Sequence, residues 1–272
     1  SNIMLHEFDD WMEANYLSKK VRKDRGAWNF GILKQRPLAV RENRQWKPGV
    51  SYCRYADDFV VVVKGTKTHA EALREACRTF LEGKLKLMLN MEKTHITHVN
   101  DGFVFLGHRI IRKRGPRGHL RPVTTIPWEK YRSFTDKLVK GLSGNYSVNR
   151  MDLMESLNRT LSGWANFYQY TDYTATVFSR VDRTVFWKLG HWLARKYRRG
   201  FPSLMREHVR APEPGRATTW VLKGQNSRGW YGEQALRRLV TSRKGQFRWR
   251  NPEGNPYLIR DEHRTFLESR YA

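Results

Sequence analysis

Residues 50–64 read V-S-Y-C-R-Y-A-D-D-F-V-V-V-V-K, and this stretch decides the fold of the first part of the chain. It is rich in β-branched and aromatic residues, and a Pro-Gly pair precedes it, which is typical of β-strands. Two adjacent acids, Asp57 and Asp58, interrupt the apolar run. The pattern predicts a β-hairpin whose tight turn is built on these two acids.

The adjacent carboxylates of Asp57 and Asp58 suit a divalent metal ion. Mg²⁺ takes hard oxygen ligands, usually one or two carboxylates together with substrate phosphates. Two such ions can activate an attacking hydroxyl and stabilise a leaving pyrophosphate. A hairpin that happens to carry Asp-Asp at its tip is the simpler interpretation. Acids between Val and Phe are costly to desolvate unless a cation compensates them, which favours the metal site.

Charge is the dominant feature of the composition. Among 272 residues, 51 Lys and Arg stand against 26 Asp and Glu, which leaves a net charge of +25. Such an excess favours an anionic polymer as the partner, and nucleic acid is the first candidate. A basic protein of the ribosomal or membrane-surface kind is the alternative, but it would not explain the 10 Trp and 12 Tyr residues.

Neither secretion nor a membrane span is indicated. No apolar run approaches the length of a membrane helix, and no signal peptide is recognisable. The two cysteines, Cys53 and Cys77, have no zinc-binding or disulfide spacing. We expect both to be small core residues in a reducing compartment, either a bacterial cytoplasm or an organelle.

Periodicity predicts mixed structure in the first part of the chain. A helix is expected at 66–83, where Thr68 and Glu71 form a capping box. Strands are expected at 95–99 and 103–111.

The N-terminal residues complete this first part. Residues 1–12 read as an amphipathic helix with Ile3 on its apolar side, and residues 26–49 read as an irregular connector. A chain that starts within an element, without an initiator methionine, is expected to be a fragment.

Helical periodicity begins at Pro127 and continues for about seventy residues. Three helices are expected, of which the first stops at 141–144, the second is capped by Asn149 and the third ends in a basic run at 195–200. The aromatic residues at helical spacing are expected to pack in the core. The remaining chain is rich in Gly, Pro and Arg, with one helix expected at 233–240.

Five stretches, in order, resemble reverse transcriptases of the group II intron type. The Y-A-D-D motif at 55–58 is similar to the palm motif of that family. The stretches L-M-L-N-M-E-K-T at 87–94 and F-V-F-L-G at 103–107 resemble the two blocks that follow it, and 1–9 resembles the block before it. The stretch S-G-W-A-N-F-Y at 162–168 resembles the signature of the thumb, or maturase, domain.

The resemblance implies roles for individual residues. Asp57 and Asp58 would be the catalytic metal ligands, and Asp57 would bind both ions. Lys93 would lie near the incoming triphosphate, although an ordinary solvated lysine is an equally good interpretation. The residues close to nucleotide and primer would be Tyr55, Ala56 and Lys93, and the primer grip would comprise Phe105, Leu106 and Gly107.

The resemblance also implies cofactors and partners. Two Mg²⁺ ions, with Mn²⁺ as a substitute, would serve the complete active site. An RNA template, a DNA primer and a structured intron RNA would be the nucleic-acid partners, and no membrane is involved. In the family, a third metal-binding aspartate and the fingers lie upstream of the region matched here. We therefore expect a missing N-terminal half as partner and no primer extension by this chain alone. The oligomeric state stays open.

Cations on the expected helices and tail are candidates for nucleic-acid binding, with a solvated charged face as the alternative. The tail faintly resembles the DNA-binding region of the family. No Cys-pair or His-Asn-His pattern follows, so no nuclease domain is expected. The candidates are Arg159, Arg180, Arg183, Lys188, Arg195, Lys196, Arg198, Arg199, Arg248 and Arg250.

The expected fold class is α+β. A partial polymerase palm of antiparallel hairpin strands plus helices would occupy 1–122, an α-helical thumb bundle 123–205 and a small basic segment 206–272. The leading hypothesis is an RNA-directed DNA polymerase and splicing maturase. One alternative is an RNA-binding splicing cofactor with a non-catalytic palm. The other is a related reverse transcriptase recruited to repair or defence.

Overall fold

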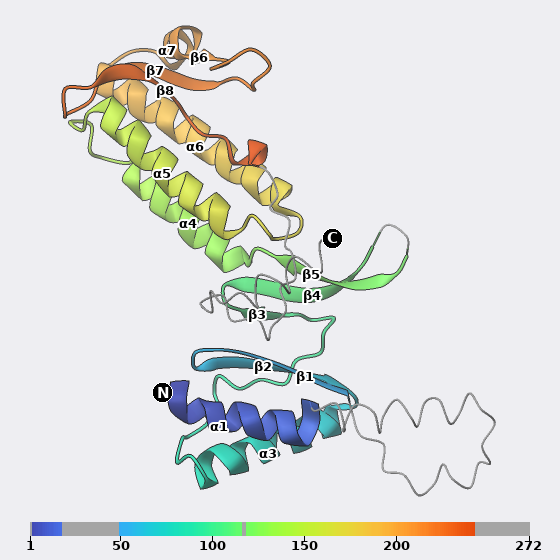
Figure 1. The fold of residues 1–272 in the computed structure, drawn as a ribbon. Helices are drawn as coiled ribbons and strands as arrows, with labels where there is room; N and C mark the ends of the chain where they lie inside the picture. Colours follow the sequence, from blue (N-terminus) through green and yellow to red (C-terminus); the bar gives the residue numbers. More distant parts are fainter. Residues whose placement is uncertain (1, 18–48, 116–117, 243–272) are drawn as a thin grey trace, which may run out of the picture. The chain divides into compact units, whose positions relative to one another are not determined.

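The computed structural model describes residues 2–17, 49–115 and 118–242 (Figure 1). The expected connector at 26–49, apart from its last residue, and the tail beyond 242 lie outside these ranges. The chain forms two compact units, Ser1–Phe105 and Leu106–Ala272, each of which is described by itself. The division falls earlier in the chain than the boundary expected at residue 122.

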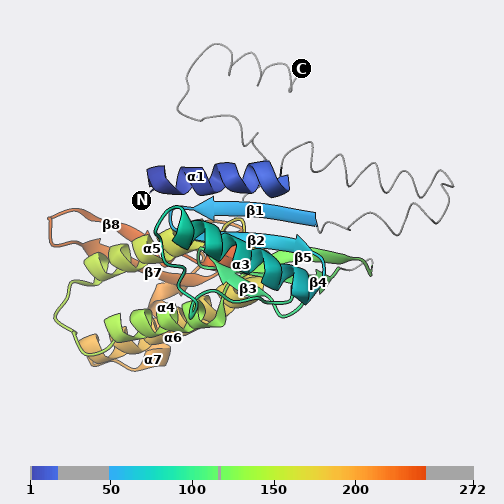
Figure 2. The same ribbon diagram turned by 90° about the horizontal axis from the view of Figure 1, so that it is seen from below.

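The first unit is a hairpin with two helices on one of its faces. Strands β1 (Gly49–Tyr55) and β2 (Asp58–Lys64) pair antiparallel. Helices α1 (Asn2–Met12) and α3 (Lys67–Gly83) lie on the same side of this hairpin, and a short π-helix, Glu13–Leu17, continues α1 (Figure 1). Figure 2 shows α1 running along the hairpin. Because a two-stranded sheet is marginal alone, the helices stabilise it.

Alternation along the strands builds the core of this unit. Val50 is buried and Tyr52 half-buried on the helix-facing side, whereas Ser51 and Cys53 on the other side are exposed, so the expected place of Cys53 in the core is wrong. Cys77 is buried as expected, whereas Ile3 of α1 is 90% exposed. The buried core comprises Leu5, Phe8, Met12, Val50, Leu73, Cys77, Leu81 and Leu85.

Two local expectations in this unit are wrong. Helix α3 is capped by Thr66, whose hydroxyl accepts the backbone N–H of His69 at 3.4 Å, while Glu71 pairs with Lys67 at 3.7 Å. His69 Nδ1 accepts the Thr66 N–H in return, so the imidazole takes the place of the expected acid. Residues 95–99 form no strand, although their composition favours one, because a strand also needs a neighbour to pair with.

The stretch expected as one strand at 103–111 is divided by a turn. Strand β3 (Phe103–Phe105) ends before Leu106 and Gly107, which have φ values of 48° and 77°. Strand β4 (His108–Arg114) follows and pairs antiparallel with β5 (Leu120–Thr125). The left-handed backbone at two successive residues ends the strand, and glycine adopts it without strain.

Three helices form the bundle of the second unit, which confirms the expectation. They are α4 (Trp128–Gly141), α5 (Arg150–Phe167) and α6 (Thr174–Tyr197), and they lie side by side in Figure 1. The Asn149 side chain accepts the Met151 N–H at 2.8 Å and caps α5 as predicted. None of the described helices is both long and apolar enough to cross a membrane.

The chain after the bundle packs onto it rather than forming a separate appendage. Helix α7 (Phe201–His208) leads into a sheet of β6 (Val209–Arg210), β7 (Thr219–Gln225) and β8 (Tyr231–Ala235), and a 3₁₀ turn follows at Leu239–Thr241. The helix expected at 233–240 is therefore wrong, because residues 233–235 pair with β7 and only the short 3₁₀ turn follows. The segment contributes Leu204, Trp220, Leu222, Leu236 and Leu239 to the core of the bundle.

Polar contacts fasten this sheet to the helices. The Asn158 amide donates to the Ala235 carbonyl at 2.8 Å and accepts the Arg237 N–H at 2.8 Å. The indole N–H of Trp220 donates to the Phe186 carbonyl at 2.8 Å. These bonds satisfy buried or half-buried polar groups, so bundle and sheet form one body.

Candidate functional site

The tip of the β1–β2 hairpin carries the candidate metal ligands. Tyr55 pairs with Asp58, so the turn consists of Ala56 and Asp57, and Asp58 opens β2. The expectation that both acids build the turn is therefore half right. Ala56 has φ 52°, a left-handed conformation that costs a non-glycine residue about 1–2 kcal/mol.

Both carboxylates are exposed, as is Tyr55 at 65%. The expected burial of the acid pair between apolar residues is therefore wrong, because the apolar side chains face α1 and α3 instead. No cation is needed to stabilise the fold, and the oxygens of Asp57 and Asp58 are free to meet a ligand. The described residues hold no group of three or more His, Cys, Asp or Glu that could bind a metal. Two carboxylates alone suit Mg²⁺ as part of a larger set of oxygen ligands.

Arg54 connects the turn to α1. Its Nη1 donates to the Ala56 carbonyl at 2.8 Å, and its Nε donates to Asp9 Oδ1 at 2.9 Å. Nη2 reaches Asp9 Oδ2 at 2.5 Å, and the Tyr52 hydroxyl donates to Asp9 Oδ1 at 2.7 Å. Asp9 is therefore engaged in holding the hairpin. This network, which the sequence did not indicate, fixes the backbone beside the two acids.

The network shifts the titration of its members. Burial raises the pKa of the Asp9 carboxyl, but the hydrogen bonds from Arg54 and Tyr52 outweigh it, and the net pKa lies below the ordinary value of 3.8. The hydrogen bond to Asp9 raises the pKa of Arg54, and burial together with the Asp9 bond raises that of Tyr52. The ionised carboxylate is therefore the form that stabilises the fold.

We expect Asp9→Asn to lower the free energy of unfolding by about 1–3 kcal/mol at pH 7, the usual scale for hydrogen bonds to a charged group. Because the folded-state pKa is lowered, this stabilisation is present above the unfolded pKa near 4 and is lost as pH falls through the folded value. Urea denaturation at pH 7 and pH 3 measures it. Asp10→Asn is the control, since the Asp10 side chain is 71% exposed. A difference for Asp9→Asn that is equal at both pH values would contradict the assignment.

The turn expected to belong to the primer grip is held by aromatic residues of α5 and its C-terminal cap. The Tyr168 hydroxyl donates to the Gly107 carbonyl at 3.2 Å, and the Phe167 ring would touch a Cβ at Gly107 at 3.4 Å. The His108 ring stacks on Phe167 with centroids 5.0 Å apart. Phe167 is 54% exposed, so its expected place in the core is wrong and it supports this turn instead. Tyr170, also expected in the core, is 49% exposed.

Lys93 is exposed, and its backbone N–H donates to Asn90 Oδ1 at 3.1 Å. This contact shapes a local turn and leaves the role of the Lys93 ammonium group a prediction. Phe105 closes β3 and is half-buried.

Helix α6 presents cations that no acid of the same helix neutralises. Asp182, the single acid of α6, accepts the N–H groups of Leu239 at 2.7 Å and Val240 at 3.1 Å. Burial raises the pKa of Asp182, and these two hydrogen bonds oppose that rise. We call the exposed cations and indoles around this helix the α6 face: Trp128, Arg132, Arg180, Arg183, Trp187 and Lys188.

Two indoles lie among the cations of the α6 face. Trp128 is 47% exposed, and the guanidinium groups of Arg132 and Arg180 lie 5.4 and 5.5 Å from its ring centroid. Trp187 is also 47% exposed and stacks on Phe201. Cations interleaved with exposed aromatic rings suit phosphates and unpaired bases.

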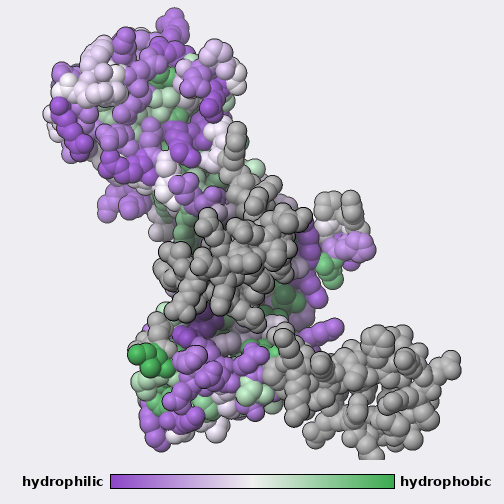
Figure 3. Space-filling model, in the orientation of Figure 1, coloured by the Kyte–Doolittle hydropathy of each residue, from purple (hydrophilic) through white to green (hydrophobic). Residues whose placement is uncertain are grey.

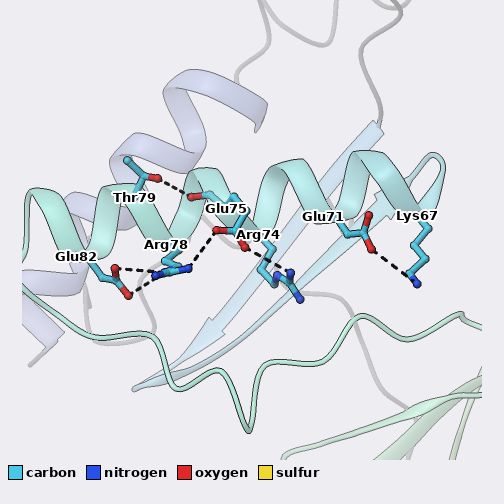
Figure 4. A network of polar contacts seen from close by, with 7 residues as sticks. All are labelled: Lys67, Glu71, Arg74, Glu75, Arg78, Thr79 and Glu82. Atoms are coloured by element: carbon cyan, nitrogen blue, oxygen red, sulfur yellow. Dashed lines mark hydrogen bonds and ion pairs between the residues drawn. The ribbon is translucent and has the colours of Figure 1, made fainter.

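Helix α3 shows what a balanced surface looks like in the same chain. Figure 4 shows three cations and three acids alternating along it, with ion pairs Lys67–Glu71, Arg74–Glu75 and Arg78–Glu82. Such a surface is solvated and has no net attraction for phosphate. Figure 3 shows that hydrophilic residues dominate the visible face of the second unit.

The remaining predicted cations divide into groups. Arg159 pairs with Glu155 at 2.6 Å and Arg199 with Glu207 at 2.6 Å, while the Lys196 ammonium donates to the carbonyls of Tyr146 and Val148. These three side chains therefore have structural contacts. Arg195 donates to the Tyr146 hydroxyl, Arg198 is exposed at the end of α6, and Arg248 and Arg250 lie outside the described residues.

Comparison with known proteins gives the class first. Residues 29–110 match the family Reverse transcriptase (RNA-dependent DNA polymerase). Residues 131–210 match a second family, Group II intron, maturase-specific domain, which includes the predicted thumb signature. These two matched segments support the group II intron type of reverse transcriptase and maturase that the motifs predicted.

Individual relatives match shorter segments. Protein YkfC of Escherichia coli is 64% identical over 138 residues, which cover 51% of this chain and 36% of YkfC. Group II intron-encoded protein LtrA of Lactococcus lactis is 43% identical over 114 residues, covering 38% of this chain and 18% of LtrA. Nuclear intron maturase 2, mitochondrial, of Arabidopsis thaliana is 27% identical over 124 residues, which cover 41% of this chain and 16% of that protein. The matches thus span well under half of each relative.

Proposed function

We propose that this chain supplies the catalytic hairpin and the nucleic-acid-binding helices of an RNA-directed DNA polymerase that also acts as a splicing maturase. The observation that carries the proposal is the exposed pair Asp57 and Asp58 at the tip of the hairpin. Arg54 holds the backbone of this tip through its hydrogen bond to the Ala56 carbonyl. Helix α6 accompanies the hairpin, with exposed cations and a single acid, Asp182, that is engaged by Leu239 and Val240.

In this proposal, Asp57 and Asp58 hold the metal and Tyr55 and Ala56 lie beside the primer end. Two magnesium ions, or manganese in their place, supply activation of the primer hydroxyl and stabilisation of the leaving pyrophosphate. Arg54 keeps the turn in its strained backbone conformation. The turn at Leu106 and Gly107, supported by Phe167 and Tyr168, would contact the primer backbone in this proposal, because glycine allows close approach.

The described residues bring no third acid to Asp57 and Asp58. We therefore expect that this chain by itself binds RNA but does not extend a primer. A further reverse transcriptase segment completes the site in this account. Its nucleic-acid partners are an RNA template, a DNA primer and a structured intron RNA, since intron-encoded proteins are among its relatives. A bacterial cytoplasm or an organelle is the proposed location.

Nucleic-acid binding by the α6 face is open to a direct test. Changing Arg180, Arg183 and Lys188 together to Gln is expected to weaken RNA binding and to lower the slope of log K against log salt by up to about 3, near 1 per lost phosphate contact. The matched control changes Lys67, Arg74 and Arg78 on α3, which removes the same charge from a balanced surface. Fluorescence anisotropy over a range of salt concentrations measures both variants. Equal losses would mean that net charge alone binds the RNA.

An RNA-binding splicing cofactor with a non-catalytic palm is the second candidate. The match to the maturase-specific domain, together with the exposed cations of α6, supports it. The test is a variant in which both Asp57 and Asp58 are changed to Asn. Splicing that persists in this variant would show that splicing does not need the two acids. DNA synthesis that is lost in the same variant would support the catalytic proposal. Recruitment to repair or defence uses the same residues and is the third candidate.

A further inference from the structure

The β7–β8 hairpin carries two exposed aromatic residues at its tip. Trp230 is 52% exposed and Tyr231 is 63% exposed. Both lie beyond the matched maturase-specific region, which ends at residue 210. The chain there is neither part of the α6 face nor part of the YADD hairpin.

The loop of this hairpin is held rigidly. The Asn226 Oδ1 accepts the N–H of Arg228 at 3.0 Å and that of Trp230 at 2.9 Å. Asp152, in the first turn of α5, accepts the Ser227 N–H at 3.2 Å. Because the backbone is fixed by these bonds, the side chains it presents are placed before any partner arrives, which lowers the entropic cost of binding.

The position of the Trp230 ring depends on the absence of a side chain at Gly232. The indole lies over Gly232, where a Cβ would overlap the ring atoms. One side of the ring is therefore covered by the strand, and the exposed remainder faces solvent. Gly232 is paired with Gly224 across the hairpin, so the two glycines share one face of it.

The cation on the same face of the hairpin as this indole is Arg150, whose Nη2 also donates to the Lys223 carbonyl. Its Nη2 lies 3.2 Å from the Cβ position of Gly224, directly across the ladder from Gly232. Arg150 and Lys196 also line a polar hollow of about 460 Å³, whose other lining residues include Ser147, Asn149 and Gln225 and no acid. Two of the three ammonium donors of Lys196 bind the carbonyls of Tyr146 and Val148, which leaves one donor for a ligand. The exposed ring and the hollow with its two cations thus lie on one face of the hairpin. Tyr231 points to the opposite face, because successive residues of a strand alternate.

We propose that this face binds one unpaired nucleotide of RNA, with its base stacked on Trp230 and its phosphate in the hollow beside Arg150 and Lys196. Bases inside a duplex are already stacked on each other, so a fixed aromatic ring selects a bulged or single-stranded base. An acidic peptide could also bind the positive hollow. The flat ring on the same face favours a base instead, because a base can stack on it. This inference rests on RNA being a partner of the chain.

The test compares two labelled RNA duplexes of equal length, one fully paired and one with a single bulged adenosine. Fluorescence anisotropy with the whole chain is expected to give about 10-fold tighter binding to the bulged duplex, within the range for one stacked base. Trp230→Ala is expected to remove this preference and leave binding to the paired duplex within about twofold. Trp230→Phe retains a ring and is expected to keep part of the preference.

Two further variants separate ring placement from ring presence. Gly232→Ala keeps every charge and the indole, but its Cβ displaces the ring, so the preference should again be lost. Tyr231→Ala is the matched control, since it removes a neighbouring exposed ring from the opposite face and should leave the preference intact. Circular dichroism checks that each variant is folded.

The outcomes distinguish this inference from the proposed function. No preference for the bulge in the unchanged chain, or a preference that survives Trp230→Ala, overturns the inference alone. Equal loss in Trp230→Ala and Tyr231→Ala would also overturn it, because placement on one face would not matter. If the chain binds neither duplex, the inference and RNA binding by the chain fail together.

Discussion

Gly190→Ala is expected to destabilise the second unit by about 1–3 kcal/mol, the usual cost of overpacking a core. The new Cβ would lie 2.5 Å from Trp220 Cζ2 and would overlap the Phe201 ring. Trp220 cannot move aside easily, because it is fully buried and its indole N–H is bonded to the Phe186 carbonyl. Gly190 is thus the point where α7 and β7 approach α6 closely.

Gly163→Ala is the matched control on α5, where a Cβ meets nothing within 4 Å. There the higher helix propensity of Ala should stabilise the chain by up to about 1 kcal/mol. Urea unfolding followed by circular dichroism compares the two midpoints. The packing described here would be contradicted if both glycines tolerated Ala equally well.

Asp57→Asn is expected to lower primer extension by the complete protein roughly 10³-fold or more, because loss of a metal ligand removes several kcal/mol of transition-state stabilisation. RNA affinity should stay unchanged, since the substitution leaves every cation of the α6 face in place and keeps the shape of the side chain. Asp10→Asn provides the control, as an exposed acid on α1. Single-turnover extension on an RNA template separates chemistry from binding. A small effect of Asp57→Asn would remove this residue from the mechanism.

The helical repeat of apolar residues in the sequence predicted the helical part well. The apolar stripes of α4, α5 and α6 and the Asn149 cap depend on residues a few positions apart, so local spacing determines them. The turn at Leu106 and Gly107 was missed, because Phe103–Ile111 has strand composition throughout. Strand β8 was expected as a helix because its structure depends on pairing with β7, from which it is separated by a loop.

The candidate site was predicted only in part, because local motifs locate its residues but contacts between distant residues determine their surroundings. Motif order located Asp57 and Asp58, but their exposure depends on which hairpin face α1 and α3 cover. The bond of Arg54 to Asp9 joins residues 45 apart, and no local pattern announces it. Similarly, the sequence supplied the cations of α6, whereas their freedom from acids depends on Asp182 being engaged by Leu239 and Val240.

One measurement tests most directly whether this chain contributes two carboxylates and a nucleic-acid surface to a site completed elsewhere. Primer extension on an RNA template, with Mg²⁺ and deoxynucleotides, is compared for this chain alone and for this chain joined by the N-terminal half of a reverse transcriptase of its family. RNA should bind in both samples, and extension should occur only in the second, where Asp57→Asn abolishes it. Robust extension by the chain alone, or extension that survives Asp57→Asn, would show that the two carboxylates are not part of a site completed by the N-terminal half.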